Sequence, residues 1–163
     1  MKDALSIIQS YLTEAPVNIE GIIRSLGIEL DKKAELDNDI SGQIEKLPDG
    51  SYKISVNKAD HYFRQRFTMA HELAHFLFHR SLIGDGVDDN KAYRSTSTGR
   101  FYNTNITSKH ETQANQFAAS VLMPESLVNK LRDEFGGNLD ELSKKLQASK
   151  QAISIRLDAM NNN

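Results

Sequence analysis

Two histidines and a glutamate lie within five residues of one another, in the order His71-Glu72-Leu73-Ala74-His75. On an α-helix, residues four apart lie about one turn apart on the same face, so both imidazoles can reach one metal ion. Glu72 then lies beside them, where its carboxylate can contact water without binding the ion. This arrangement suits hydrolysis, because the ion lowers the pKa of a water molecule and the carboxylate passes its proton to the leaving amine. The motif predicts a zinc site with His71 and His75 as ligands and Glu72 as the catalytic general base.

A catalytic zinc ion usually has three protein ligands, so a third residue must come from elsewhere. The chain has no cysteine, which leaves histidine, aspartate and glutamate. His79 continues the four-residue spacing, but it lies two helical turns, roughly 12 Å, from His71 and is too far away to share an ion. We expect His79 to be solvated at the helix C-terminus, where it interacts favourably with the helix dipole. On chemistry alone the candidates are His61, His110, Glu111 and the acids between Ser81 and Thr107.

Glu111 is the favoured third ligand, because its helix carries small and apolar residues that would allow close packing on the central helix. The alternative is a helix cap, with Ser108 as N-cap and Glu111 at the third position of a capping box. The local pattern favours neither role. One turn further, Asn115 is either a solvated residue or a partner that orients a ligand histidine through its second ring nitrogen. Two imidazoles and a carboxylate suit zinc, and they also accept manganese or iron.

The elements that must position these residues follow from hydrophobic patterns. A broad apolar face, wide enough for deep burial, predicts a central helix over about residues 60–79. Before it, the segments 40–45 and 52–56 alternate apolar and polar residues around Pro48-Asp49-Gly50, which predicts a β-hairpin. Residues 28–30 are a candidate third strand. Further helices are expected over 1–12, 19–26, 109–122, 124–136, 139–147 and 150–160.

The expected architecture is α+β, with a small antiparallel β-sheet packed against several helices and a helical C-terminal tail. We predict a single domain over residues 1–163, because this length suits one hydrophobic core better than two. Its parts are 1–58 with the first helices and the hairpin, 59–124 with the metal-site helices, and 125–163 as the tail. The long segment 81–107 is predicted to be a lid, a docking surface or a disordered loop.

The composition excludes several classes of protein. The net charge of -2 does not call for nucleic acid or an anionic membrane as a partner. No apolar run approaches the roughly 20 residues that span a bilayer, and the N-terminus lacks the features of a signal peptide. A cytoplasmic protein is therefore expected, with no membrane partner.

Two long motifs together resemble the ImmA/IrrE family of metallopeptidases. The first runs from Arg66 to His75 and the second from Glu111 to Pro124, and the resemblance covers most of the chain. It implies a zincin-like metallopeptidase core that binds one zinc ion, with Glu111 as the third ligand rather than a capping residue. The sequence departs from many relatives at Ala74, where they carry glycine; alanine is also small and favours helix. The family further implies a protein substrate, such as a helix-turn-helix repressor or an antitoxin.

Two other functions compete with this one. Residues 139–157 have the pattern of a helix-turn-helix, so the protein could bind DNA phosphates through basic residues of the tail, namely Lys144, Lys145, Lys150 and Arg156. A structural tail with solvated charges is favoured, because the net charge is negative. The second competing function is that of a non-proteolytic regulator, a partner in a toxin-antitoxin or phage system, with a structural or vestigial metal site. Candidates to stabilise an oxyanion are His61, His110, Tyr93 and Tyr102.

Overall fold

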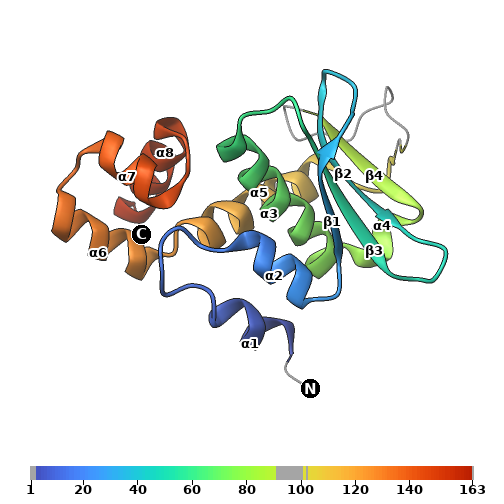
Figure 1. The fold of residues 1–163 in the computed structure, drawn as a ribbon, viewed down its shortest axis with the longest axis horizontal. Coiled ribbons are helices and arrows are strands. Elements are labelled where there is room, and N and C mark those ends of the chain that lie inside the picture. Colours follow the sequence, from blue (N-terminus) through green and yellow to red (C-terminus); the bar gives the residue numbers. More distant parts are fainter. Residues whose placement is uncertain (1–2, 91–100, 102, 163) are drawn as a thin grey trace.

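The computed structural model describes residues 3–90, 101 and 103–162. Over this part of the chain there are eight helices and one four-stranded sheet, so the predicted α+β class is confirmed. Figure 1 shows the sheet on one side, the helices α3 (Tyr62–Phe78) and α5 (Ser108–Leu122) in the middle, and the C-terminal helices on the other side. Among the described residues, no helix has both the length and the apolar character needed to cross a membrane.

The sheet is mixed rather than antiparallel. Strands β2 (Ile40–Lys46) and β3 (Tyr52–Asn57) form the predicted hairpin, and β4 (Gly86–Asn90) pairs antiparallel with the other side of β2. The first strand runs parallel to β3, so the antiparallel prediction is wrong for this pair. An alternating pattern gives no information on the partner, and here the first strand pairs with the second arm of the hairpin. The strands lie in the order β1 (Glu29–Ala34), β3 (Tyr52–Asn57), β2 (Ile40–Lys46) and β4 (Gly86–Asn90).

Helix α3 packs on one face of the sheet and carries the histidine motif. It begins after His61, whose side chain accepts a hydrogen bond from the backbone N–H of Phe63. A glycine in β2 allows the helix to come close, since a Cβ atom at Gly42 would lie 2.4 Å from Cγ2 of Thr68 and 3.7 Å from Cγ of Glu72. The absence of that side chain brings Glu72 directly beneath the sheet.

The segment expected to be one long loop contains regular structure. A short helix, α4 (Arg80–Ile83), leads into β4, so the loop prediction is wrong for this part. The backbone N–H of Asp88 donates to the carbonyl of Phe101 at 3.0 Å. Phe101 therefore lies against the outer edge of β4. Residues 91–100 and 102 of the expected loop, which include Tyr93 and Tyr102, lie outside the described residues. The prediction of a lid or docking surface therefore stays a prediction.

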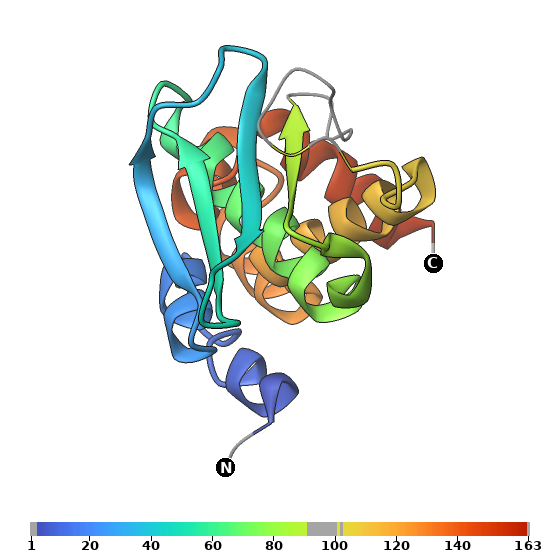
Figure 2. The same ribbon diagram turned by 90° about the vertical axis from the view of Figure 1, so that its right-hand side faces the viewer.

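Helix α5 packs against α3, and its small residues Ala114 and Ala118 are fully buried. The N-terminal helices α1 (Ala4–Gln9) and α2 (Ile19–Ser25) lie at one end of the molecule (Figure 2). Of these, α2 packs against α3 and the first strand, with Asn18 as its N-cap. Helix α3 therefore contacts both α5 and α2.

The C-terminal tail consists of α6 (Glu125–Phe135), α7 (Leu139–Leu146) and α8 (Lys150–Asn161). Three of its basic residues have partners within the chain. Lys150 pairs with Asp140, Arg156 donates to the carbonyl of Met123 at 3.0 Å, and Lys145 lies 5.2 Å from the ring centre of Phe135. The structural role of the tail stays a prediction.

Candidate metal centre

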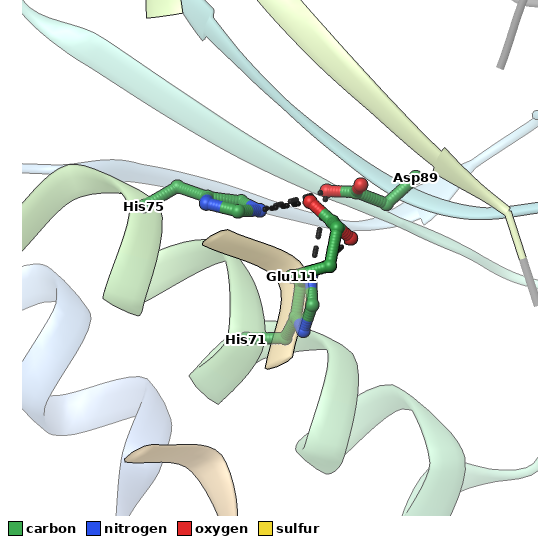
Figure 3. Close-up of side chains that lie close together, drawn as sticks. All are labelled: His71, His75, Asp89 and Glu111. Carbon is green, nitrogen blue, oxygen red and sulfur yellow. Dashed lines mark hydrogen bonds and ion pairs between the residues drawn. The ribbon is translucent and has the colours of Figure 1, made fainter. Parts of the chain in front are cut away.

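The structure brings together the three residues predicted to bind the metal. His71 and His75 lie one turn apart on α3, with ring centres 4.8 Å from each other, and both are fully buried. Glu111 approaches them from α5, with Oε2 3.1 Å from Nε2 of His71 and Oε1 2.9 Å from Nε2 of His75 (Figure 3). One carboxylate thus faces both imidazoles. Their roles as ligands remain predictions that this geometry permits.

Glu111 is free to face the histidines because another residue caps its helix. The helix begins after Thr107, one residue earlier than the predicted cap, and His110 occupies the third position of the capping box. The backbone N–H of Thr107 donates to Nδ1 of His110 at 2.9 Å. The alternative with Ser108 and Glu111 is therefore wrong. Because the box is shifted by one residue, Glu111 lies on the face that meets α3.

A fourth side chain joins this group from the sheet. Oδ2 of Asp89, on β4, lies 3.6 Å from Nε2 of His71 and 3.3 Å from Nε2 of His75. The ligand atoms of the four residues all lie within 4.8 Å of one another, and all four side chains are buried. We call His71, His75, Asp89 and Glu111 the four-residue cluster. Asp89 was included among the acids of the long segment, but nothing in the local pattern distinguished it from them.

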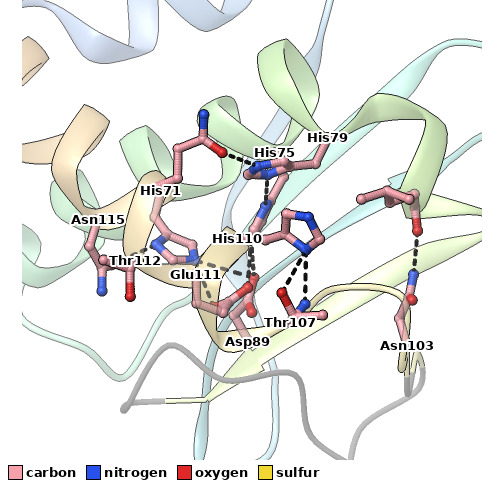
Figure 4. Close-up of polar contacts among 12 residues, drawn as sticks. His71, His75, His79, Asp89, Asn103, Thr107, His110, Glu111, Thr112 and Asn115 are labelled. Atoms are coloured by element: carbon pink, nitrogen blue, oxygen red, sulfur yellow. Dashed lines mark hydrogen bonds and ion pairs between the residues drawn. The ribbon is translucent and has the colours of Figure 1, made fainter.

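The second ring nitrogen of each histidine has its own partner (Figure 4). Nδ1 of His71 lies 2.8 Å from Oδ1 of Asn115, which agrees with the orienting role, one of the two alternatives for Asn115. Nδ1 of His75 lies 3.0 Å from Nδ1 of His79, and Nε2 of His79 lies 2.7 Å from Oε1 of Gln113. Partners of this kind fix the ring orientation and the tautomer of a metal-binding histidine. They leave Nε2 of both rings directed at the cluster.

The prediction that His79 is solvated is wrong, since only 3% of its surface is exposed. Helix α5 covers the end of α3, and the ring of His110 lies 4.7 Å from that of His79 between centres. The rejection of His79 as a ligand agrees with the structure, because its Nδ1 faces His75 rather than the cluster. His61 and His110, the other histidine candidates, accept hydrogen bonds at the starts of α3 and α5.

Glu72 lies beside the cluster with its carboxylate fully buried. Within the described part of the chain, neither of its oxygens forms a hydrogen bond of good geometry. Burial raises the pKa of Glu72 well above its ordinary value, and the nearby carboxylates of Asp89 and Glu111 raise it further. A bound cation would oppose this shift, because it favours the charged carboxylate.

The two imidazoles differ in protonation without a metal. Burial is the main cause that lowers the pKa of His71, to about 4. Burial also acts to lower the pKa of His75, but the carboxylates of Asp89 and Glu111 outweigh it and raise that pKa to about 9. In the metal-free protein one proton is therefore held on His75 between two acids, where a cation would otherwise lie.

The hydrogen bonding of the buried polar atoms tests whether a metal fits this site. Among the described residues, six buried side-chain atoms around the cluster lack a hydrogen bond of good geometry: Nε2 of His75, Oε1 of Glu111, and both carboxylate oxygens of Glu72 and of Asp89. Burying polar groups that lack well-formed hydrogen bonds is costly, and a divalent cation would compensate these atoms together. Imidazole nitrogen and carboxylate oxygen are ligands of zinc, and also of manganese and iron. The site fits a metal ion.

Comparisons with known proteins support a peptidase-like domain. The model of the peptidase M78 family, described as the IrrE N-terminal-like domain, matches residues 24–158. The radiation response metalloprotease IrrE of Deinococcus radiodurans is 34% identical over 102 residues, which are 59% of this chain and 27% of that protein. The chain thus spans about a quarter of that relative's length.

A solved structure resembles nearly the whole chain. It is a transcriptional regulator of Mycobacterium tuberculosis, and the comparison has a TM-score of 0.62 at 15% identity. The match covers 94% of this chain and 45% of that protein. At this identity the likeness shows a shared fold and nothing about activity.

Proposed function

Because the chain belongs to the peptidase M78 family of IrrE N-terminal-like domains, we propose that it is a zinc-dependent peptidase that cleaves a regulatory protein. The observation that carries the proposal is the position of Glu72. Its carboxylate is fully buried beside the four-residue cluster and has no hydrogen bond of good geometry within the described residues. A general base needs such a position, next to the ion and outside its set of ligands.

Each residue of the site has a separate role in peptide hydrolysis. His71, His75 and Glu111 would hold the zinc ion, which when bound supplies a Lewis acid that lowers the pKa of water. Glu72 takes the proton of the attacking water and delivers it to the nitrogen of the leaving amine. Asn115 and His79 keep the two imidazoles oriented during these steps, because each contacts the ring nitrogen directed away from the cluster.

The substrate is proposed to be a cytoplasmic protein, either a helix-turn-helix repressor or an antitoxin. Family membership supports a regulatory substrate, as does the name of the Deinococcus relative, a metalloprotease of the radiation response. Because the chain corresponds to only 27% of that relative, the substrate of the longer protein does not transfer directly.

One observation favours a second candidate, a non-proteolytic regulator with a structural metal site. Asp89 adds a fourth side chain to the cluster, and structural zinc sites usually have four protein ligands. In that case Glu72 would have no chemical role. Replacing the Glu72 carboxylate therefore separates the two candidates.

The test uses the zinc-loaded chain and the repressor encoded nearest to it. We expect the wild type to cleave the repressor, and Glu72→Gln to lower the cleavage rate by about 10²- to 10⁴-fold while still binding one zinc ion. Glu134→Gln, on the exposed side of α6, is the matched control and should cleave normally. Equal cleavage by Glu72→Gln, or cleavage that persists after zinc is removed, would contradict the proposal.

A further inference from the structure

We propose that Asp89 is a fourth protein ligand of the metal, so that two imidazoles and two carboxylates close the site at rest. The inference relies on the metal site of the proposed function and adds a claim about its resting state. Glu111 was expected to complete the set of protein ligands, which leaves one position for water in a catalytic zinc site. Asp89 lies where it can take that position.

The burial of Asp89 is the first argument. Its side chain is fully buried, and within the described residues neither carboxylate oxygen forms a hydrogen bond of good geometry. An isolated buried carboxylate is very unfavourable unless a cation or hydrogen-bond donors compensate its charge. The nearest candidates for such a cation are a proton on His75 and a metal ion bound by the cluster. Oδ2 of Asp89 lies 3.3 Å from Nε2 of His75, close enough for one ion to contact both atoms.

The fold holds Asp89 in this position. Asp89 lies opposite Gly42 in the pairing of β4 with β2, and the register shifts between Ile40 and Gly42. A β-bulge of this kind bends a strand and redirects its side chains, and such bulges are common beside active sites. Gly42 is also the residue over which α3 approaches the sheet. The strand that carries Asp89 and the helix that carries the histidines therefore meet at one point.

The preceding residue provides a comparison. Asp88 is equally buried, but its Oδ2 accepts a hydrogen bond from the backbone N–H of Phe101 at 2.6 Å. Asp88 thus connects β4 to a neighbouring segment, whereas Asp89 faces the histidines. Two adjacent buried aspartates have different surroundings, and only one of them is within reach of the proposed ion.

A site closed in this way has a consequence for regulation. While Asp89 binds the ion, no position is left for water, so Glu72 has no substrate water to deprotonate. Asp89 must move away before hydrolysis can begin. The resting protein would be latent. Small anions could not bind its metal, because no coordination position would be open.

The first experiment measures zinc affinity by competition with a chromophoric chelator. Asp89→Asn and Asp89→Ala should each weaken zinc binding by about 10- to 100-fold or more, since even the loss of a residue that only supports a ligand has an effect of this size. Asp88→Asn removes the same charge from the neighbouring position and should stay within about threefold of the wild type. If the Asp89 variants bind zinc as tightly as Asp88→Asn, Asp89 is not a ligand.

The second experiment uses cobalt(II) in place of zinc and follows its visible absorption during titration with azide. We expect the wild-type spectrum to remain unchanged and the Asp89→Ala spectrum to shift, because an anion can enter only where a position is open. A wild-type spectrum that shifts at the same azide concentration would overturn the proposal. Neither experiment requires cleavage of a substrate. A result against Asp89 as a ligand can therefore be distinguished from a failure of the proposed peptidase activity.

Discussion

The Nδ1 atoms of His75 and His79 lie 3.0 Å apart, so two imidazoles at the end of α3 share one proton. Nε2 of His79 lies 2.7 Å from Oε1 of Gln113, an oxygen that can only accept a hydrogen bond. His79 therefore carries its proton on Nε2 and accepts one from His75. His75 therefore keeps a proton on Nδ1, and Nε2 is the nitrogen that gives up its proton and binds when a metal enters the cluster.

Removal of this partner should weaken the metal site. We predict that His79→Ala raises the dissociation constant for zinc by about 10- to 100-fold, because His75 loses the contact that fixes its tautomer. The measurement is a competition titration with a chelator. His61→Ala is the matched control, since His61 contacts the start of α3 and should leave zinc affinity unchanged. An unchanged dissociation constant in His79→Ala would show that the contact does not orient His75.

Zinc affinity should increase with pH. Without metal the pKa of His75 is raised from 6.5 to about 9, so at neutral pH zinc must displace a proton from this ring. His71, with its pKa lowered to about 4, is already neutral. For each proton displaced, affinity should rise about tenfold per pH unit between pH 6 and 8. Calorimetry in buffers of different ionisation enthalpy measures the protons released, and a value near zero would contradict this account.

The stability of the metal-free protein should decrease as the pH rises, whereas its zinc affinity increases. A histidine whose folded pKa lies above its unfolded value stabilises the fold at low pH. For His75 this contribution is fully present below about pH 6.5 and is lost as the pH rises through about 9. Zinc binding removes the proton and with it this dependence.

Close approach of α3 to the sheet depends on Gly42. We predict that Gly42→Ala destabilises the protein by about 1–3 kcal/mol, because the new Cβ would lie 2.4 Å from Cγ2 of the fully buried Thr68. Urea denaturation measures the change. Gly137→Ala is the control, since no atom lies within 4 Å of its added Cβ.

A second substitution tests the cause of this effect. Thr68→Ser removes the methyl group that the new Cβ would meet and should recover part of the stability lost in Gly42→Ala. If the two substitutions together cost the sum of their separate effects, the contact with Thr68 is not responsible.

The motif on α3 was predictable from sequence because its geometry is local. A spacing of four residues fixes the positions of His71 and His75 wherever the helix lies. Glu111 was harder to assign, since a shift of one residue in the capping box decides its direction, and Thr107 is a favoured N-cap residue as well as Ser108. Only the family resemblance distinguished between these two possibilities in the sequence.

Asp89 could not be identified in this way. Its strand has five residues and Val87 as its one large apolar residue, so it carries no alternating pattern that predicts a strand. Its burial arises from pairing with a strand more than forty residues earlier in the chain. The parallel pairing of the first strand was missed for the same reason, because partners and directions in a sheet depend on contacts distant in sequence.

The central claim is that one zinc ion binds between α3 and α5 beside Glu72. A crystal structure of the zinc-loaded protein, with anomalous diffraction at the zinc edge, tests it most directly. We predict a single peak at about 2.0–2.2 Å from Nε2 of His71, Nε2 of His75 and a carboxylate oxygen of Glu111, with Glu72 close by but not bound to the ion. A peak elsewhere, or a Glu111 side chain directed away from the two histidines, would contradict the account.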